Sequence, residues 1–142
     1  MDLIYTLQQT DQIAAQLVKK YASKPVWVFQ APMGAGKTTL IAAIGKALGI
    51  QQAMSSPTFS IMNEYEVNGK LIYHMDWYRL ESEAEARQAG VEAAMDEADL
   101  SLVEWPEKAP NLVPDGAVVF NIEILDPSHR RIYINNENES SE

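Results

Sequence analysis

The chain has 142 residues, of which 46% are hydrophobic, and it contains three Trp, six Tyr and no Cys. This length and composition predict a globular protein with one sizeable core, and they exclude disulfides, a thiol nucleophile and a cysteine-based zinc site. Eleven Lys and Arg against twenty Asp and Glu give a formal net charge of −9. A protein that binds nucleic acid by itself is therefore disfavoured, because the average surface repels phosphodiesters.

The opening segment of the sequence does not resemble a signal peptide. The opening segment, MDLIYTLQQTDQ, lacks the basic part of a signal peptide, and no apolar run approaches the roughly 18 residues of a membrane span. We therefore expect a cytoplasmic protein that does not contact a membrane. Residues 1–134 are expected to form a single domain, and the acidic segment NNENESSE, residues 135–142, is expected to be a disordered tail.

The first half of the chain predicts a helix, a strand, a loop and a second helix. The apolar spacing after Thr10 indicates a helix over residues 11–22 with that threonine as N-cap. The segment PVWVFQ, residues 25–30, is short and rich in β-formers, which is typical of a buried strand. After a glycine-containing loop, residues 37–49 predict a helix that ends at Gly49.

The second half predicts strands separated by turns and by one helical region. Asn68-Gly69 lies between two strand-like segments and strongly favours a hairpin. The acidic, Ala-rich residues 81–99 predict two short helices broken near Gly90, LSLVEW predicts a buried strand, and AVVFNIEIL with RIYIN predicts a final hairpin. This order indicates an α/β fold, a three-layer sandwich like that of the P-loop NTPases with a mixed central sheet.

Residues 31–38, APMGAGKT, follow the phosphate-loop pattern with alanine in its first position. Gly34 and Gly36 allow the backbone to approach phosphates, and the loop's N–H groups would form an anion nest at the start of a helix. Lys37 is expected to reach the β- and γ-phosphates and the Thr38 hydroxyl to ligate Mg²⁺. An ordinary turn with a surface lysine is the alternative, but the strand before the loop and the helix after it favour nucleotide binding by Met33, Gly34, Ala35, Gly36, Lys37, Thr38 and Thr39.

Two predicted strands end in acids, Asp76 and Glu104. Ligands gather at the carboxyl ends of strands in an open α/β sheet, so these carboxylates are candidates for organising Mg²⁺. The simpler alternative is that strands often end in acidic loops. Thr58, in SSPTFS, is a candidate to reach the metal or the γ-phosphate from a switch-like loop.

The segment YHMDWYR, residues 73–79, surrounds Asp76 and carries other polar side chains. Alternation along a strand places His74 and Tyr78 on the same face as this acid. A lone His here is more often structural, Tyr78 fits either the core or the site, and Arg79 either senses phosphate or pairs with an acid. The sequence leaves these alternatives open.

The other motifs of the sequence, present or missing, indicate which class of nucleotide-dependent protein this is. No Asn-Lys-x-Asp motif is present to read guanine, and the chain has only four arginines and no evident lid for a metabolite kinase. A small ATPase that acts on a partner is the favoured interpretation. A small-molecule P-loop phosphotransferase and a nucleotide-gated binding module remain the alternatives.

Four motifs in this order, MGAGKTT, SPTF, YHMDWYR and VEWPE, resemble the TsaE family over residues 6–134. The resemblance implies an ATPase that binds ATP or ADP with Mg²⁺, is weak alone, and functions in tRNA threonylcarbamoyladenosine biosynthesis. It also implies that TsaB and TsaD are the partners, that ATP hydrolysis resets this pair between turnovers, and that tRNA is contacted only through them.

The family's residue roles carry over by motif. The resemblance implies that Lys37 holds phosphate, that Thr38 and Glu104 serve Mg²⁺, and that Asp76 is needed for hydrolysis, so that Lys37, Asp76 and Glu104 form the catalytic set. It places Thr58 in a switch-like segment and Trp105 beside the nucleotide, although Trp105 also suits a core position. The family's usual loop, Gly-Asp-Leu-Gly-Ala-Gly-Lys-Thr, differs here in its first three residues.

Three points stay open at the level of sequence. Pro32, in the altered part of the loop, removes one N–H from the nest. Adenine contacts have no short motif, and Thr10, the 128–131 turn and the N-terminal segment are all candidates. The 81–99 region is either a partner-docking surface or a solvated helix face.

Overall fold

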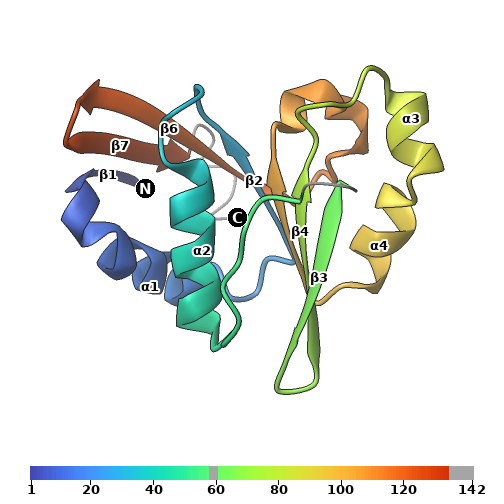
Figure 1. Ribbon diagram of the computed structural model, residues 1–142, viewed down its shortest axis with the longest axis horizontal. Coiled ribbons are helices and arrows are strands. Elements are labelled where there is room, and N and C mark those ends of the chain that lie inside the picture. Colours follow the sequence, from blue (N-terminus) through green and yellow to red (C-terminus); the bar gives the residue numbers. More distant parts are fainter. Residues whose placement is uncertain (58–60, 135–142) are drawn as a thin grey trace.

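The computed structural model describes residues 1–57 and 61–134. Thr58 and the 135–142 tail therefore lie outside the described residues. In the described part, seven strands form one sheet in the order β1-β7-β6-β2-β5-β4-β3 (Figure 1). Their bounds are β1 Asp2–Thr6, β2 Val26–Gln30, β3 Met62–Val67, β4 Lys70–Asp76, β5 Leu100–Glu104, β6 Val118–Asp126 and β7 His129–Ile134.

The sheet is mixed, as predicted, with a parallel centre and antiparallel margins. β2 lies between β5 and β6 and is parallel to both, and β4 is parallel to β5. The pairs β3–β4, β6–β7 and β1–β7 are antiparallel. Every residue of β5 and four of the five residues of β2 are buried, which explains why these strands appear in the sequence as continuous apolar runs.

Helices cover both faces of the central strands (Figure 1). α1 (Thr10–Lys20) and α2 (Lys37–Leu48) pack on one face, against a core that includes Trp27 and Phe29. α3 (Glu83–Gln88) and α4 (Val91–Glu97) pack on the other face, with two 3-10 turns, η2 (Pro106–Lys108) and η3 (Pro110–Leu112). The result is the predicted three-layer α/β sandwich. None of the described helices is long and apolar enough to cross a bilayer.

The predicted hairpin and helix break are confirmed. Asn68 and Gly69 both have positive φ, 53° and 78°, as a two-residue hairpin turn between β3 and β4 requires. α3 and α4 are separated at Gly90. β4 ends at Asp76, so Tyr78 lies beyond the strand and does not share its face.

The first helix begins one residue before the predicted start, and its predicted N-cap, Thr10, is wrong. Residues Leu7–Gln9 form a 3-10 turn, η1, and α1 begins at Thr10 with Gln9 at the cap position. The Thr10 hydroxyl donates to the Leu7 carbonyl at 2.7 Å and therefore does not cap the helix. Thr6 begins the turn instead, and its N–H donates to Gln9 Oε1 at 2.9 Å, which is a capping arrangement one turn earlier. α1 also ends at Lys20, two residues before the predicted end.

Candidate nucleotide site

The phosphate loop connects β2, in the centre of the sheet, to the first residue of α2. Gly34 and Gly36 have φ of 81° and 89°, a conformation that L side chains rarely adopt. A Cβ at either glycine would meet no atom within 4 Å, so space for a ligand lies beside the backbone. Ala31 is not among the described non-glycine residues with positive φ, which are Asn68 and Trp105. Alanine therefore meets the conformational need of the loop's first position.

Lys37 is buried and is held by its own loop and by Trp105. Its Nζ donates to the Ala31 carbonyl at 3.1 Å and lies 3.4 Å from the centroid of the Trp105 ring, a cation–π contact. Burial lowers the pKa of Lys37, and the negative charges of Glu104, Glu107 and Asp76 oppose this effect. The carboxylates therefore favour the ammonium form that phosphate binding requires.

Glu104 lies at the centre of a chain of polar side chains. Its Oε1 accepts a hydrogen bond from the Thr38 hydroxyl at 3.2 Å, and its Oε2 lies 2.7 Å from His74 Nε2. The Thr38 hydroxyl is also 3.1 Å from the Ser56 hydroxyl. These hydrogen bonds join α2 to β5 and to the segment that follows α2 at the Thr38 hydroxyl, and Glu104 extends the connection to His74 on β4.

Asp76 and Glu104 are neighbours at the carboxyl ends of two parallel strands. They are register partners on β4 and β5. The Trp77 N–H donates to the Glu104 carbonyl at 3.1 Å, which continues the pairing past the end of β4. Asp76 Oδ1 accepts from the Tyr78 N–H at 3.0 Å, so its carboxylate also shapes the turn that leaves the strand. The structure therefore confirms that these two acids lie together at this edge of the sheet.

These residues line a cavity of about 600 Å³ at the start of α2. All the sequence-predicted site residues that the structure describes contribute to it: Met33, Gly34, Ala35, Gly36, Lys37, Thr38, Thr39, Asp76, Glu104 and Trp105. The cavity is also lined by Ser56, Pro57, Ile61, Tyr78 and Arg79. Thr58 cannot be placed, because it lies outside the described residues.

Aromatic side chains form part of the cavity's rim. The Tyr78 and Trp105 rings are 5.0 Å apart, and Lys108 Nζ is 5.4 Å from the Tyr78 ring centroid. Tyr78 is 45% exposed, so it belongs to the rim and not to the core. Trp105 has φ of 59°, which turns the chain sharply after Glu104. Trp105 lines the cavity and also packs, partly buried, against the core beneath α3 and α4, so its position combines the two alternatives.

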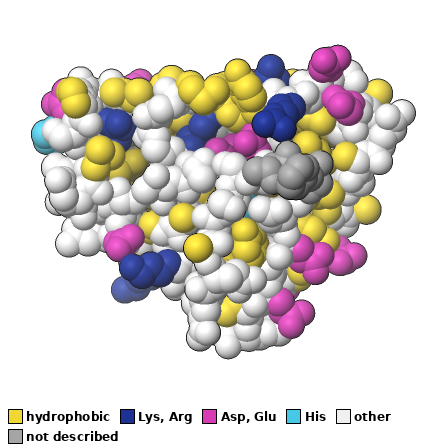
Figure 2. Space-filling view, viewed as in Figure 1, with side chains coloured by type: hydrophobic (Ala, Val, Ile, Leu, Met, Phe, Trp, Pro, Cys, Tyr) yellow, Lys and Arg dark blue, Asp and Glu magenta, His cyan; other side chains and the backbone are white. Residues whose placement is uncertain are grey.

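The electrostatic character of the site is mixed. On the face drawn in Figure 2, basic side chains lie at separate places and form no continuous patch. The lining of the cavity includes two basic side chains, Lys37 and Arg79, and two carboxylates, Asp76 and Glu104. Such a site suits a phosphate chain that carries a divalent cation better than a bare polyanion.

The oxygen donors of the site are of the kind that Mg²⁺ prefers. Thr38 and Glu104 present a hydroxyl and a carboxylate 3.2 Å apart, and Mg²⁺ commonly takes one or two carboxylates together with substrate phosphates and water. In the part of the chain that the structure describes, no group of three His, Asp, Glu or Cys side chains could hold a metal. The residues present therefore fit a cation that arrives with a nucleotide.

Three residues that contact the predicted site residues were not themselves assigned to the site from the sequence. Ser56 belongs to the SPTF motif, but only Thr58 was selected from it. His74 was placed on the same strand face as Asp76, but its role was left open, with a structural role the more common one. Arg130, whose Nε donates to the Ala35 carbonyl at 3.0 Å, lies in the 128–131 turn. That turn was a candidate only for adenine contacts, and no pattern links it to the loop. Thr10 and Arg131, from the segments considered for adenine, hydrogen-bond to Leu7 and to Asp2 respectively.

A strand–loop–helix with two left-handed glycines, a buried lysine and acids at the adjacent strand ends defines the P-loop class of nucleotide-binding folds. The family model described as "Threonylcarbamoyl adenosine biosynthesis protein TsaE" matches residues 4–132. The chain belongs to the TsaE family, and thus to the proteins of tRNA threonylcarbamoyladenosine biosynthesis.

Individual relatives agree with this assignment. A tRNA threonylcarbamoyladenosine biosynthesis protein TsaE from Haemophilus influenzae is 34% identical over 81% of this chain and 73% of its own length. The corresponding Synechocystis protein is 38% identical over 75% and 69%. The crystal structure of Bacillus subtilis YdiB superposes with a TM-score of 0.73 at 25% identity, and the match covers 98% of this chain and 90% of that one.

Proposed function

We propose that the protein is an Mg²⁺-dependent ATPase whose hydrolysis cycle drives the TsaB–TsaD pair in the formation of tRNA threonylcarbamoyladenosine. The observation that carries the proposal is the convergence of Lys37, Thr38, Asp76 and Glu104 on one cavity at the phosphate loop. Family membership supports the pathway. That the protein hydrolyses ATP, and that TsaB and TsaD are its partners, are proposals that go beyond family membership.

Each side chain has a role that its position supports. The Lys37 ammonium would leave the Ala31 carbonyl and the Trp105 ring to meet the β- and γ-phosphates. Thr38 and Glu104 would hold Mg²⁺, which when bound neutralises charge on the phosphate oxygens. Asp76, at the adjacent strand end, would orient the attacking water, because its carboxylate lines the same cavity.

The surface charge supports an indirect relationship with tRNA. A formal charge of −9 disfavours direct binding of a phosphodiester backbone, and on the face drawn in Figure 2 the basic side chains lie apart from one another. We therefore assign tRNA binding to the partners. We also propose that the chain is cytoplasmic. Its nucleotide cycle would act on the complex and not on the nucleic acid.

Phosphate release from ATP, measured with and without TsaB–TsaD, tests the proposal. We expect slow turnover by the protein alone, a faster rate with the pair, and neither in Lys37→Ala. Turnover no greater than that of Lys37→Ala in both conditions would contradict ATPase activity. In a parallel reaction, γ-labelled ATP is incubated with a metabolite pool. A labelled organic phosphate ester would indicate a phosphotransferase instead.

A further inference from the structure

Arg130 is a buried cation that connects the β6–β7 turn to the phosphate loop. It lies on β7 and is only 6% exposed. Its Nε donates to the Ala35 carbonyl at 3.0 Å, across 95 positions of sequence. Arg130 itself does not line the cavity, whereas Ala35 and Gly36 do. The guanidinium therefore contacts the loop on the side away from the cavity.

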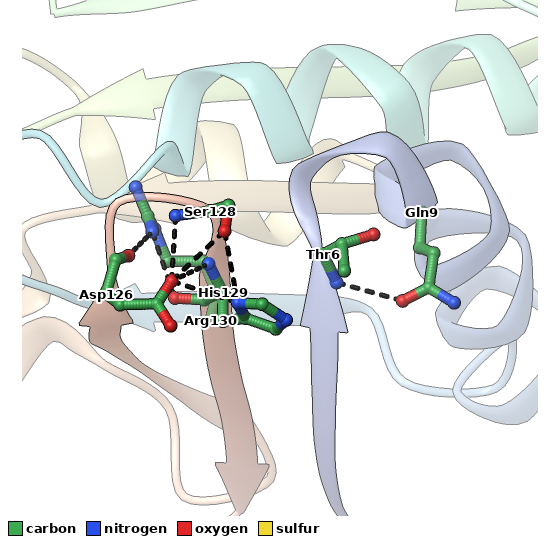
Figure 3. A network of polar contacts seen from close by, with 6 residues as sticks. All are labelled: Thr6, Gln9, Asp126, Ser128, His129 and Arg130. Carbon is green, nitrogen blue, oxygen red and sulfur yellow. Dashed lines mark hydrogen bonds and ion pairs between the residues drawn. The ribbon is translucent and has the colours of Figure 1, made fainter.

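The other end of the guanidinium is fixed by the turn from which it projects. Arg130 Nη1 donates to the Asp126 and His129 carbonyls at 2.8 and 3.0 Å. Asp126 stabilises this turn, because its Oδ1 accepts hydrogen bonds from the N–H groups of Ser128 and His129, both at 2.9 Å (Figure 3). A carboxylate, a turn and a guanidinium thus form one connected unit that ends on the loop.

The orientation of one peptide group follows from this contact. In a trans peptide the carbonyl of one residue and the N–H of the next point in opposite directions. Because Arg130 binds the Ala35 carbonyl from outside the cavity, the Gly36 N–H points to the opposite side. Gly36 has φ of 89° and leads directly into Lys37 at the start of α2. Its N–H therefore belongs to the set that would meet a phosphate.

Among the described residues, the three hydrogen-bond acceptors of Arg130 are backbone carbonyls, which are uncharged. Burial of a cation among neutral acceptors is costly compared with burial of an apolar side chain. A simple core role would be filled as well by Leu or Met. The fork of donors, by contrast, suits a residue that must hold two separate backbone segments at a set distance.

We propose that Arg130 is a positioning residue of the nucleotide site, which aims the Gly36 N–H at the phosphates by fixing the Ala35–Gly36 peptide. This inference rests on the proposed function in one respect, since it takes the loop's ligand to be a nucleotide phosphate. It adds that the β6–β7 turn is a structural part of the phosphate site.

The test compares Arg130→Gln and Arg130→Lys with Arg131→Gln. Arg131 is the neighbour on β7, but it bonds Asp2 at 2.7 and 2.9 Å and Glu123 at 3.2 Å, away from the loop. Affinity for Mg-ADP is measured by calorimetry well below the melting temperature of each variant. The Gly36 amide is followed by ¹H–¹⁵N NMR in the free proteins, because its shift reports the peptide directly and needs no nucleotide.

We expect Arg130→Gln to weaken Mg-ADP binding about tenfold, equivalent to about 1.4 kcal/mol, and to shift the Gly36 amide. Arg130→Lys should do both to a smaller degree, because one ammonium cannot span both acceptor sets. Arg131→Gln should leave both unchanged. If Arg130→Gln does not fold, Arg130→Lys decides the matter in the same way.

Two results would overturn the inference, and a third concerns only the proposed function. A folded Arg130 variant with wild-type affinity and an unmoved Gly36 amide would show that the contact is only structural. An equal loss of affinity in Arg131→Gln would show the same. Absence of Mg-ADP binding by the wild-type protein would contradict the proposed function. The Gly36 shift in the free variants would then decide the positioning role alone.

Discussion

Glu104 and His74 form a buried pair beneath the nucleotide cavity, with 2.7 Å between Glu104 Oε2 and His74 Nε2 and side chains 3% and 0% exposed. An ionised carboxylate only accepts hydrogen bonds, so a hydrogen bond to ionised Glu104 requires the His74 proton on Nε2. Among the described residues, His74 Nδ1 then has no hydrogen-bond partner. Because the Thr38 hydroxyl binds the other carboxylate oxygen, Glu104 is held from both sides and points at the start of α2.

The first prediction concerns this pair. His74→Leu removes the donor and leaves a buried carboxylate oxygen unsatisfied, which should lower the free energy of unfolding by about 1–3 kcal/mol. ATP turnover should fall as well, because Glu104 is freed to rotate. His74→Gln, which keeps a donor, is the control and should lose less of both. Urea unfolding and phosphate release measure the two effects. A leucine variant as stable and active as wild type would refute this account.

Glu104→Gln should separate binding from catalysis. The amide keeps the size of the side chain but loses the charge that serves Mg²⁺, so turnover should fall by roughly 10²-fold or more. ADP affinity measured without Mg²⁺ should stay within a few-fold of wild type, since the loop is unchanged. A proportional loss of both quantities would mean that Glu104 holds the nucleotide itself.

Asp76→Asn is expected to reduce hydrolysis while nucleotide affinity stays close to that of the wild type. The amide can still accept the hydrogen bond from the Tyr78 N–H that the carboxylate accepts at 3.0 Å, so the turn after β4 should persist. The loss therefore reports the carboxylate's charge and not the local fold. Single-turnover hydrolysis and calorimetry provide the comparison. Wild-type hydrolysis by this variant would remove Asp76 from the catalytic set.

Trp105 should report nucleotide binding by fluorescence. Lys37 Nζ lies 3.4 Å from its ring centroid, and movement of this ammonium to a phosphate would change the environment of the indole. Trp27 and Trp77 are 1% and 0% exposed and should contribute a constant background. We expect an emission change on addition of Mg-ADP that is absent in Trp105→Phe. A change retained in Trp105→Phe would mean that another residue is the source.

The carboxylate of Asp126 should make the stability of the β6–β7 turn sensitive to acid. Hydrogen bonds from His129 and from the Ser128 N–H lower the pKa of Asp126 from 3.8 to about 2. A lowered pKa means that the carboxylate stabilises the fold above pH of about 4 and that this contribution disappears as the pH falls toward about 2. The melting temperature of Asp126→Asn should therefore lie below wild type near neutrality, with the gap closing across that window. A gap independent of pH would argue against it.

Local chemistry made much of the site predictable. The phosphate loop was recognisable because its glycines, Lys37 and Thr38 act through backbone conformation and short spacing, which the sequence records directly. Asp76 and Glu104 were found because each ends an apolar run, and the parallel sheet brings such ends together. Two statements stay predictions: that residues 1–134 form one domain, and that each site residue has the role given to it.

By itself, the sequence determined the class of fold, the loop with the phosphate-binding pattern and the family. These depend on residue type, periodicity and spacing within short segments, where each residue acts on its near neighbours. Only the tertiary structure decided which side chains support that loop. Ser56 meets Thr38 across 18 positions, His74 meets Glu104 across 30 and Arg130 meets Ala35 across 95. Such contacts depend on strand register and on the packing of helix against sheet, which no local pattern encodes.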